Sequence, residues 1–418
     1  MRRGYVVAVL FGCCVLGSLL VMRADAGPVL ATSPAGIYPT GIAVDAQSGH
    51  AFVASNFDSS VRMIDTATGA QLRQVLLDRQ FTGADWVGVD SAKRAVYVEL
   101  EDGSLYTLDS QTGTPLHRAQ QARTVPTIFL NGNHSCALVP SLTANIANLL
   151  DAQGQVRAQY ALGLPPALQV ARDERHARIF VLTGDAILRM LDTKTCALRW
   201  ARLLPSTSSP LLYSAVFGRI DLLGESGALD DLDVRAGALL HTLRLGFSGA
   251  AGIQPAPQLL VDQDLGWVHV LAPSQGTITS INGRTGMLER VLPVPYPTAF
   301  LLNPMTHHLL VASSGPTNAV GDPLGAGSLQ VLDVLHGEIL RMVRLGIAPI
   351  SLGYDRRTGH VLVVNAETNP DGTAVRPHTS SAVFLDQLRA LASWLPLSPH
   401  TPVAHPEGSV IVLDARGL

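Results

Sequence analysis

Acidic residues in the loops of this chain are the first candidates for chemistry. They lie singly or in pairs between apolar segments, at Asp58, Glu101, Asp102, Asp185, Glu225, Asp322 and Glu367. A ring of such carboxylates could bind Ca²⁺, because calcium prefers oxygen ligands. Ordinary solvated turns also contain acidic residues, and no EF-hand sequence is present. Ca²⁺ is therefore the one cofactor that these loops would allow, and no other cofactor is predicted.

The histidines fall into two groups. His378, His400 and His405 lie outside any repeated segment and could ligate a metal or act as a base. Their separations of 22 and 5 residues, in a proline-rich stretch, match no zinc-ligand spacing. A second group follows one recurring turn, which favours a structural role: His50, His134, His176, His308 and His360.

The cysteines give no metal or haem motif. Cys13 and Cys14 belong to an apolar N-terminal segment, which leaves Cys136 and Cys196, and no CxxC or CxxCH occurs. In an oxidising compartment Cys136 and Cys196 could form a disulfide, and two separate buried thiols are the alternative. The Gly-x-Ser-x-Gly, P-loop and dinucleotide signatures are all missing.

Residues 1–26 have the three parts of a secretory signal. A short basic start is followed by an apolar run at 5–22 and by Ala24-Asp25-Ala26, which fits a small-x-small cleavage site. Two alternatives stay open, an uncleaved membrane anchor and a lipid-attachment signal at Cys13. The protein is expected to be exported, periplasmic or extracellular, and to contact a membrane only if this segment is retained.

The overall composition favours a well-packed domain that does not bind nucleic acid. Of the 418 residues, 47% are hydrophobic and 15% charged, so a large core can form. The formal net charge is −3, and Lys93 and Lys194 are the only lysines. Without a basic stripe, a nucleic-acid surface is not expected.

A repeated strand ending determines the predicted architecture. It occurs as SVRMID (60–65), SLYTLD (104–109), NIANLLD (145–151), AILRMLD (186–192), ALDDLD (228–233), TITSIN (277–282), SLQVLD (328–333) and SVIVLD (409–414). In five copies a glycine follows four places after the last residue. Because Asp can bond the backbone two residues on and Gly can adopt a positive φ, Asp-x-x-x-Gly is expected to close a hairpin.

A second hairpin precedes each of these endings, so each unit has four antiparallel strands. In the first unit 41–45 and 50–55 flank a short turn, and 71–77 forms the last strand. In the seventh and eighth units, separate strands are expected at 338–346 and 351–355. Short, regular strands without helices between them favour a β-propeller with one blade per unit.

Residues 39–69, with PTGIAVD and later SVRMIDTATG, resemble the YVTN-type repeat of exported bacterial β-propellers. The resemblance is close there, clear at 349–365 and 409–414, and looser between. It implies the propeller fold and an exported protein. It implies little about function, because propellers of this kind have many functions.

The predicted fold is all-β, a single β-propeller domain at 27–418 with eight four-stranded blades. Seven blades are the alternative, because the third and fifth copies are the poorest. The eighth copy ends after its third strand, so residues 27–32 are expected to supply its outer strand and close the ring.

Two insertions interrupt the repeat, at 315–327 and 366–408, each between the second and third strands of its unit. The larger one is expected to contain a helix, because Phe384, Leu388, Leu391 and Leu395 share one helical face before Pro396. Both would rise from one face of the ring. A rim site is predicted there, from Asp58, Asp102, Asp185, Glu225, Asp322, Glu367, His378, His400 and His405.

The predicted function is an exported binding or protein-interaction scaffold, a monomer whose partner is a protein or small molecule of the cell envelope. The alternative is a metal-assisted lactonase- or lyase-like hydrolase at the channel mouth, with Asn56, Asn365 and Glu367 as candidate ligands. A quinone cofactor is disfavoured. The segment from Asp192 to Trp200 is the only near match to a quinoprotein docking repeat, and no adjacent cysteine pair lies beyond the N-terminal segment.

Overall fold

The computed structural model describes residues 29–77, 83–100, 104–119, 128–129, 136–141, 146–151, 156–161, 168–173, 175–204, 208–224, 227–246, 257–316, 324–367, 407–415 and 418. The predicted signal segment and the predicted helix in 366–408 lie outside these ranges. Across them the regular secondary structure is β-strand, apart from two single-turn 3₁₀ segments, η1 (Ser91–Lys93) and η2 (Pro273–Gln275). None of the described helical segments is both long and apolar enough to cross a membrane.

Six sheets contain four strands each, in sequence order. The first two are β2 (Pro39–Asp45), β3 (His50–Ser55), β4 (Ser60–Asp65), β5 (Gln71–Leu76) and β6 (Ala84–Asp90), β7 (Ala95–Leu100), β8 (Leu105–Asp109), β9 (Pro115–Ala119). The next two are β10 (Ile128–Phe129), β11 (Cys136–Ser141), β12 (Ile146–Asp151), β13 (Val156–Ala161) and β14 (Leu168–Asp173), β15 (Arg178–Thr183), β16 (Ile187–Asp192), β17 (Ala197–Leu203). The last two are β18 (Ser208–Ser214), β19 (Arg219–Gly224), β20 (Ala228–Asp233), β21 (Leu239–Arg244) and β22 (Gln258–Asp262), β23 (Trp267–Ala272), β24 (Thr277–Asn282), β25 (Leu288–Pro293).

A seventh sheet has seven strands in the order β1-β31-β30-β29-β28-β27-β26. Its members are β1 (Val29–Gly36), β26 (Pro297–Leu302), β27 (Leu309–Ser313), β28 (Ala326–Asp333), β29 (Glu338–Asp355), β30 (His360–Glu367) and β31 (Gly408–Asp414). The first half of β29 pairs with β28 and its second half with β30. The sheet therefore consists of two four-stranded sets that share β29. The strand pairing of the described residues gives eight such sets, called blades 1 to 8 below in chain order.

The prediction of two separate strands at 338–346 and 351–355 was wrong in detail. The connection between blades 7 and 8 is short and extended enough to join them into one strand, β29, with a register irregularity between Pro349 and Ser351. Ala348 has a φ of +49° within this connection, so the strand changes direction as it passes from one blade to the next.

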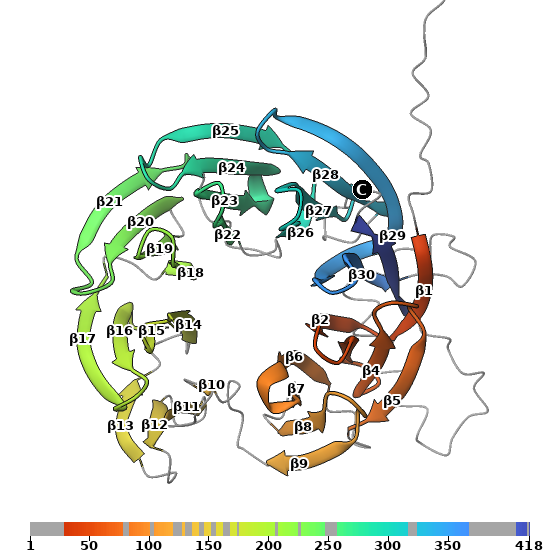
Figure 1. Cartoon of the computed structure of the whole chain (residues 1–418), viewed down its shortest axis with the longest axis horizontal. Coiled ribbons are helices and arrows are strands. Elements are labelled where there is room, and N and C mark those ends of the chain that lie inside the picture. The colour runs from red at the N-terminus through yellow and green to blue at the C-terminus, as the bar shows by residue number, and fades with distance from the viewer. Residues whose placement is uncertain are drawn as a thin grey trace, which may run out of the picture.

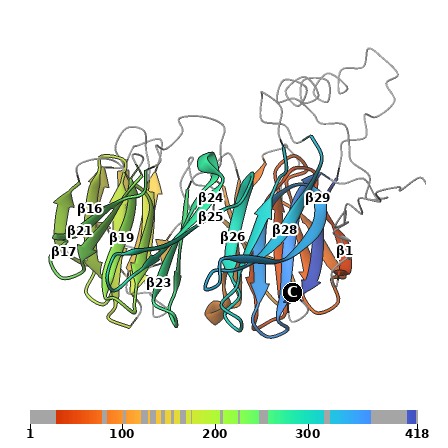
Figure 2. The same cartoon turned by 90° about the horizontal axis from the view of Figure 1, so that it is seen from above.

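The outer strand of blade 8 comes from the beginning of the described chain. β1 pairs antiparallel with β31, from Val29 opposite Leu413 to Gly36 opposite Gly408. Figure 1 shows β1 beside the last blade and the sheets arranged around a circle, with β2, β14, β22 and β26 on the inside. Figure 2 shows the strands of each sheet running across the thickness of this ring.

The recurring Asp makes the predicted turn. In blade 1 the Asp65 carboxylate accepts hydrogen bonds from the backbone N–H groups of Ala67 at 3.0 Å and Thr68 at 2.7 Å. Gly69 then adopts a φ of +73°, which a residue with a side chain rarely does. Asp109, Asp192, Asp233, Asn282 and Asp333 accept the same pair of bonds in later blades.

The glycine of this closing turn also lies under a side chain of the preceding blade. A Cβ atom on Gly237 would come 2.7 Å from the ring of Trp200, whose indole N–H donates to the Val234 carbonyl at 3.2 Å. Arg73 covers Gly113 in the same way and donates to the Thr112 carbonyl at 2.8 Å. The quinoprotein-like tryptophan is therefore a contact between blades 4 and 5.

The core lies between the sheets. Seven apolar clusters each join two adjacent blades, and within the described residues only the boundary between blades 2 and 3 lacks one. The position of the fully buried Phe52 in blade 1 and Phe180 in blade 4 faces the following blade, and in blade 7 Leu310, the second residue of β27, does the same. These positions form a column around the ring. Burying such a side chain contributes about 1.5–3 kcal/mol, so this column is a main source of stability.

Candidate functional site

Two of the predicted rim residues, Asp58 and Asp185, have described side chains, and each is engaged within its own blade. Both lie between the second and third strands and form an ion pair with the arginine four residues on. Arg62 Nη1 lies 3.2 Å from Asp58 Oδ2, and Arg189 Nη2 lies 3.5 Å from Asp185 Oδ2. These carboxylates stabilise their turns, and they belong to blades 1 and 4.

The other predicted rim residues stay untested. Asp102, Glu225, Asp322, His378, His400 and His405 lie outside the described residues, and Glu367 is described only as the residue paired with Ile347 at the end of β30. Near this rim, Arg62 also pairs with Glu407 Oε1 at 2.8 Å, which connects blade 1 to the residue before β31. Two of the candidate lactonase ligands already form side-chain hydrogen bonds. Asn56 donates to Asp85 at 2.8 Å, and Asn365 donates to Ser409 at 3.3 Å.

Two of the five repeated histidines bond to the next blade, whereas His134 lies outside the described residues and His176 pairs with Asp173 of its own turn. His50 Nδ1 lies 2.9 Å from the Ser110 carbonyl of blade 2, and His360 Nδ1 lies 2.7 Å from the Thr66 carbonyl of blade 1. Each therefore joins its blade to the next. Cys196 is disulfide-bonded. The side chain of Cys136 lies outside the described set, so its pairing with Cys196 stays a prediction.

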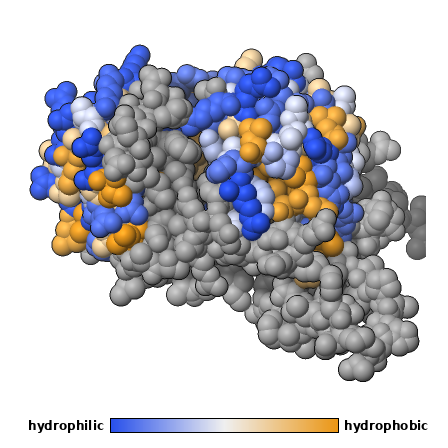
Figure 3. All heavy atoms as spheres, turned by 90° about the horizontal axis from the view of Figure 1, so that it is seen from below, coloured by the Kyte–Doolittle hydropathy of each residue, from blue (hydrophilic) through white to orange (hydrophobic). Residues whose placement is uncertain are grey.

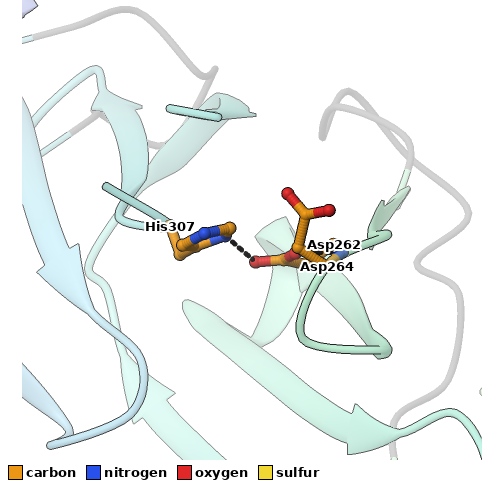
Figure 4. A group of neighbouring side chains, drawn as sticks. All are labelled: Asp262, Asp264 and His307. Atoms are coloured by element: carbon orange, nitrogen blue, oxygen red, sulfur yellow. Dashed lines mark hydrogen bonds and ion pairs between the residues drawn. The ribbon is translucent and has the colours of Figure 1, made fainter. Parts of the chain in front are cut away.

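Among the described side chains, one group combines acidic and histidine ligands closely enough to hold a metal. Asp262, Asp264 and His307 each offer an atom within 4.8 Å of the others. Figure 4 shows the imidazole of His307 pointing at the Asp262 carboxylate, with the Asp264 carboxylate above them. The two aspartates belong to blade 6 and the histidine to blade 7, so the group lies across a blade boundary.

The local fold fixes Asp262. It ends β22, and its Oδ1 accepts the backbone N–H groups of Asp264 and Leu265, both at 3.0 Å. Its Oδ2 lies 3.0 Å from His307 Nδ1. The Asp262 side chain is buried, the His307 side chain is 29% exposed and Asp264 is exposed, so solvent reaches the group past His307 and Asp264.

The same position in other blades also bonds to the next blade, but with neutral partners. Asp45 accepts from the Ser91 hydroxyl at 2.7 Å, and Asp355 accepts from the Thr66 hydroxyl at 2.5 Å. An aspartate here is therefore part of the scaffold. Asp173 of blade 4 also pairs with an imidazole, but that is His176 of its own turn, at 2.9 Å. What distinguishes the boundary between blades 6 and 7 is an imidazole from the next blade together with a second carboxylate, Asp264.

Sequence analysis missed this group because its members come from different repeats. A signal was present, however, in the first turn of each unit. This turn joins the first and second strands, and its positions are counted from the residue that ends the first strand, which is Asp262 in blade 6. The third position, held by Asp264, is Gln47, Arg175, Val216, Met305 and Arg357 in other described turns. The fifth, held by His307 at a φ of +59°, is glycine in blades 1, 5, 6 and 8.

Buried ionisable side chains occur on both sides of blade 6. At the column that holds Phe52 and Phe180, blade 5 has Asp221 and blade 6 has His269, both fully buried. His269 Nδ1 lies 2.9 Å from Ser280 Oγ, and its Nε2 has no hydrogen-bond partner within the described part of the chain. Burial lowers the pKa of His269 to about 4, which the nearby charge of Asp262 only partly opposes, so the ring is neutral.

In blade 5 two buried carboxylates share one arginine. Asp221 and Asp231 face each other across β19 and β20. Arg219 lies 2.7 Å from Asp221 through Nε and 3.0 Å from Asp231 through Nη1. Burial raises the pKa of Asp221 to about 7, because one guanidinium does not offset the desolvation of two carboxylates.

Comparisons with known proteins agree with the observed fold. A family model described as "Outer membrane protein assembly factor BamB" matches residues 22–175, which is less than half of the chain. The chain is similar to the C-terminal WD40 domain of Sif2, with a TM-score of 0.58 and 10% identity, over 93% of this chain and 99% of that one. It is also similar to the dihydro-heme d1 dehydrogenase NirN in complex with DHE, with a TM-score of 0.61 and 12% identity, over 84% and 78%. No curated protein matches the sequence.

These comparisons confirm the all-β, β-propeller prediction. They support propeller repeats similar to the assembly-factor model and do not single out the YVTN type. At 10% and 12% identity the two solved structures carry information about the fold alone.

Proposed function

We propose that this protein is an exported β-propeller that acts as a protein-interaction scaffold in the cell envelope. The match of residues 22–175 to a family described as an outer membrane protein assembly factor supports this assignment. So does the disulfide at Cys196, because disulfides persist mainly in oxidising compartments such as the periplasm. The predicted secretory signal at residues 1–26 agrees with both.

The observation that carries the proposal is the apolar outer wall of the ring. Most of the exposed large hydrophobic side chains of the described residues lie on the outermost strands rather than in loops. They are Val29, Leu30, Leu72, Leu76, Leu116, Val156, Leu198, Leu203, Leu239, Leu240, Leu288, Val291, Ile339, Leu340 and Met342. Figure 3 shows hydrophobic groups interspersed with hydrophilic ones on this wall. Exposed apolar surface of this kind favours protein contacts.

The outermost strands also offer free backbone edges. Apart from β29, which pairs with β28 and β30, each has a hydrogen-bonded neighbour on one side only, as β25 has in β24. Between blades 5 and 6 a small groove of about 240 Å³ opens on the wall, lined in part by Leu243, Arg244, Leu288 and Val291. A partner segment could pair with such an edge and place apolar side chains against the wall.

Photo-crosslinking in intact cells tests the proposal. A crosslinking amino acid at Leu240 or Val291 is expected to form discrete protein adducts, whereas one at Met305, which is 80% exposed on a first turn, is not. Adducts at Met305 equal to those at the wall, or none at the wall, would refute the proposed surface.

The same experiment also tests the partner location that the sequence predicts. That prediction puts the partner at the channel face near 315–327 and 366–408. Deleting 370–406 should then abolish the adducts. Adducts that persist after the deletion would assign the contact to the outer wall, and loss of the adducts would assign it to the insertion face.

A metal-assisted hydrolase remains the second candidate, and the Asp262, Asp264 and His307 group is the observation that favours it. Lactone hydrolysis by purified protein that depends on added metal and disappears in Asp264→Asn would support it. Metal-independent or absent turnover would reject it.

A further inference from the structure

We propose that Asp262, Asp264 and His307 bind one divalent transition-metal ion, with Zn²⁺ as the best fit, and that the ion joins blades 6 and 7. Two carboxylates and one imidazole are ligands that Zn²⁺ accepts, whereas Ca²⁺ and Mg²⁺ prefer oxygen ligands alone. The inference is independent of the scaffold proposal, because the three residues lie at the turns between the first and second strands of blades 6 and 7 and not on the outer wall.

The spacing of the ligand atoms is close to what such an ion requires. In a tetrahedral zinc site with bonds of about 2.0–2.2 Å, ligand atoms lie roughly 3.3–3.5 Å apart. His307 Nδ1 and Asp262 Oδ2 are already 3.0 Å apart. Asp264 is exposed and within 4.8 Å, so a change of its side-chain rotamer can complete three protein ligands.

The group is prepared in the way metal ligands are. Asp262 Oδ1 is held by two backbone N–H groups, which orients Oδ2 toward the boundary between the blades. His307 has a φ of +59°, and the equivalent turn position holds glycine in blades 1, 5, 6 and 8 and Arg94 or Ala177, also at positive φ, in blades 2 and 4. In blade 7 this position presents an imidazole to Asp262 of the preceding blade.

A second, independent feature of the same boundary also indicates a polar occupant. His269 is fully buried, and its Nε2 has no hydrogen-bond partner among the described residues. It alternates along β23 with Trp267 and Leu271, which pack against blade 7. A buried polar atom without a partner is destabilising, and blades 1 and 4 have Phe52 and Phe180 at the same position. An ion with bound water at this boundary would offer a polar environment to the unpartnered Nε2 of His269.

Titration of the chelator-treated full chain with ZnCl₂ by calorimetry, with CaCl₂ as the comparison, tests the proposal. One equivalent of Zn²⁺ should bind, the midpoint of thermal unfolding should rise with Zn²⁺ concentration, and Ca²⁺ should have a much smaller effect. Co²⁺ in place of Zn²⁺ should give the visible absorption of a nitrogen- and oxygen-ligated ion.

Two variants and a matched control identify the ligands. Asp264→Asn and His307→Gly should each weaken Zn²⁺ binding by at least about 10-fold. His307→Gly introduces the residue found at this position in blades 1, 5, 6 and 8, so the fold should persist. His336→Ala removes a histidine that pairs with Asp333 at 2.6 Å in blade 7 without a third ligand, and it should bind like the wild type. Equal loss in His336→Ala, unchanged binding in both ligand variants, or no binding by the wild type would overturn the proposal.

Discussion

The buried pair Asp221 and Asp231 should make the protein less stable as the pH rises toward neutrality. In the folded state the pKa of Asp221 is raised to about 7, whereas an unfolded aspartate titrates near its ordinary pKa of 3.8. The folded protein therefore holds a proton between these limits that the unfolded chain has released. By linkage, this contribution to stability is present below about pH 4 and is lost as the pH rises through about 7.

The size of the effect follows from the number of protons. One proton bound only by the folded state changes the free energy of unfolding by about 1.4 kcal/mol for each pH unit. Between pH 5 and pH 8 the expected loss is therefore about 2–3 kcal/mol, because the change levels off once the pair is ionised. Asp221→Asn removes the titration while its amide keeps an oxygen for Arg219 and offers a donor to Asp231, so it resembles the protonated state.

The assay is urea denaturation of wild type and Asp221→Asn at pH 5 to 8. The variant should match the wild type at pH 5 and be more stable by about 2–3 kcal/mol at pH 8. Asp230→Asn, whose carboxylate accepts from Thr242 at 2.6 Å, is the control and should keep the wild-type slope. His241 lies 3.9 Å from Asp231, so the pair of measurements is repeated in His241→Gln. A constant difference between variant and wild type across this range would refute the reasoning.

Three further predictions concern the scaffold. Cys196→Ser should lower the midpoint of thermal unfolding under oxidising conditions and have no effect after reduction, since a disulfide to Cys136 would close a loop of about 60 residues and contribute roughly 4 kcal/mol. Gly237→Ala should destabilise by more than about 1 kcal/mol in urea denaturation, because its φ is +63° and Trp200 leaves no room for a Cβ. Phe180→Ala should cost about 3–5 kcal/mol in the same assay, whereas Leu203→Ala, at a residue that is 76% exposed, should change stability by less than about 0.5 kcal/mol.

The sequence predicted the parts of the fold that depend on local chemistry. An Asp followed four residues later by a Gly requires one kind of turn, so Asp65 and Gly69 are enough to identify the closing hairpin. Likewise, His50 and His360 could be assigned a structural role because they recur at one repeat position. The bend within β29 could not be predicted, because it depends on how closely blades 7 and 8 approach.

The candidate metal group could not be assembled from the sequence, because Asp262 and His307 are 45 residues apart and meet only when the two blades pack. Aligning the first turns shows Asp264 and His307 as exceptions, but not that they face each other. The rim residues were the opposite case. Asp58 and Asp185 lie in the predicted kind of loop, and the arginine four residues after each one already occupies its carboxylate.

Blade 6 is distinguished by the ionisable side chains that are buried at its two boundaries. Blades 1 and 4 place Phe52 and Phe180 against the next blade, and contacts of this kind need no partner beyond shape. Asp221 and His269 at the same depth need protons, an arginine or an ion to be satisfied, so the strength of the two boundaries of blade 6 depends on pH and on bound metal. Each of these boundaries also has an apolar cluster, whose packing does not depend on pH. The fully buried Asp221 and His269 therefore add a contribution that depends on solution conditions to an apolar contact that does not.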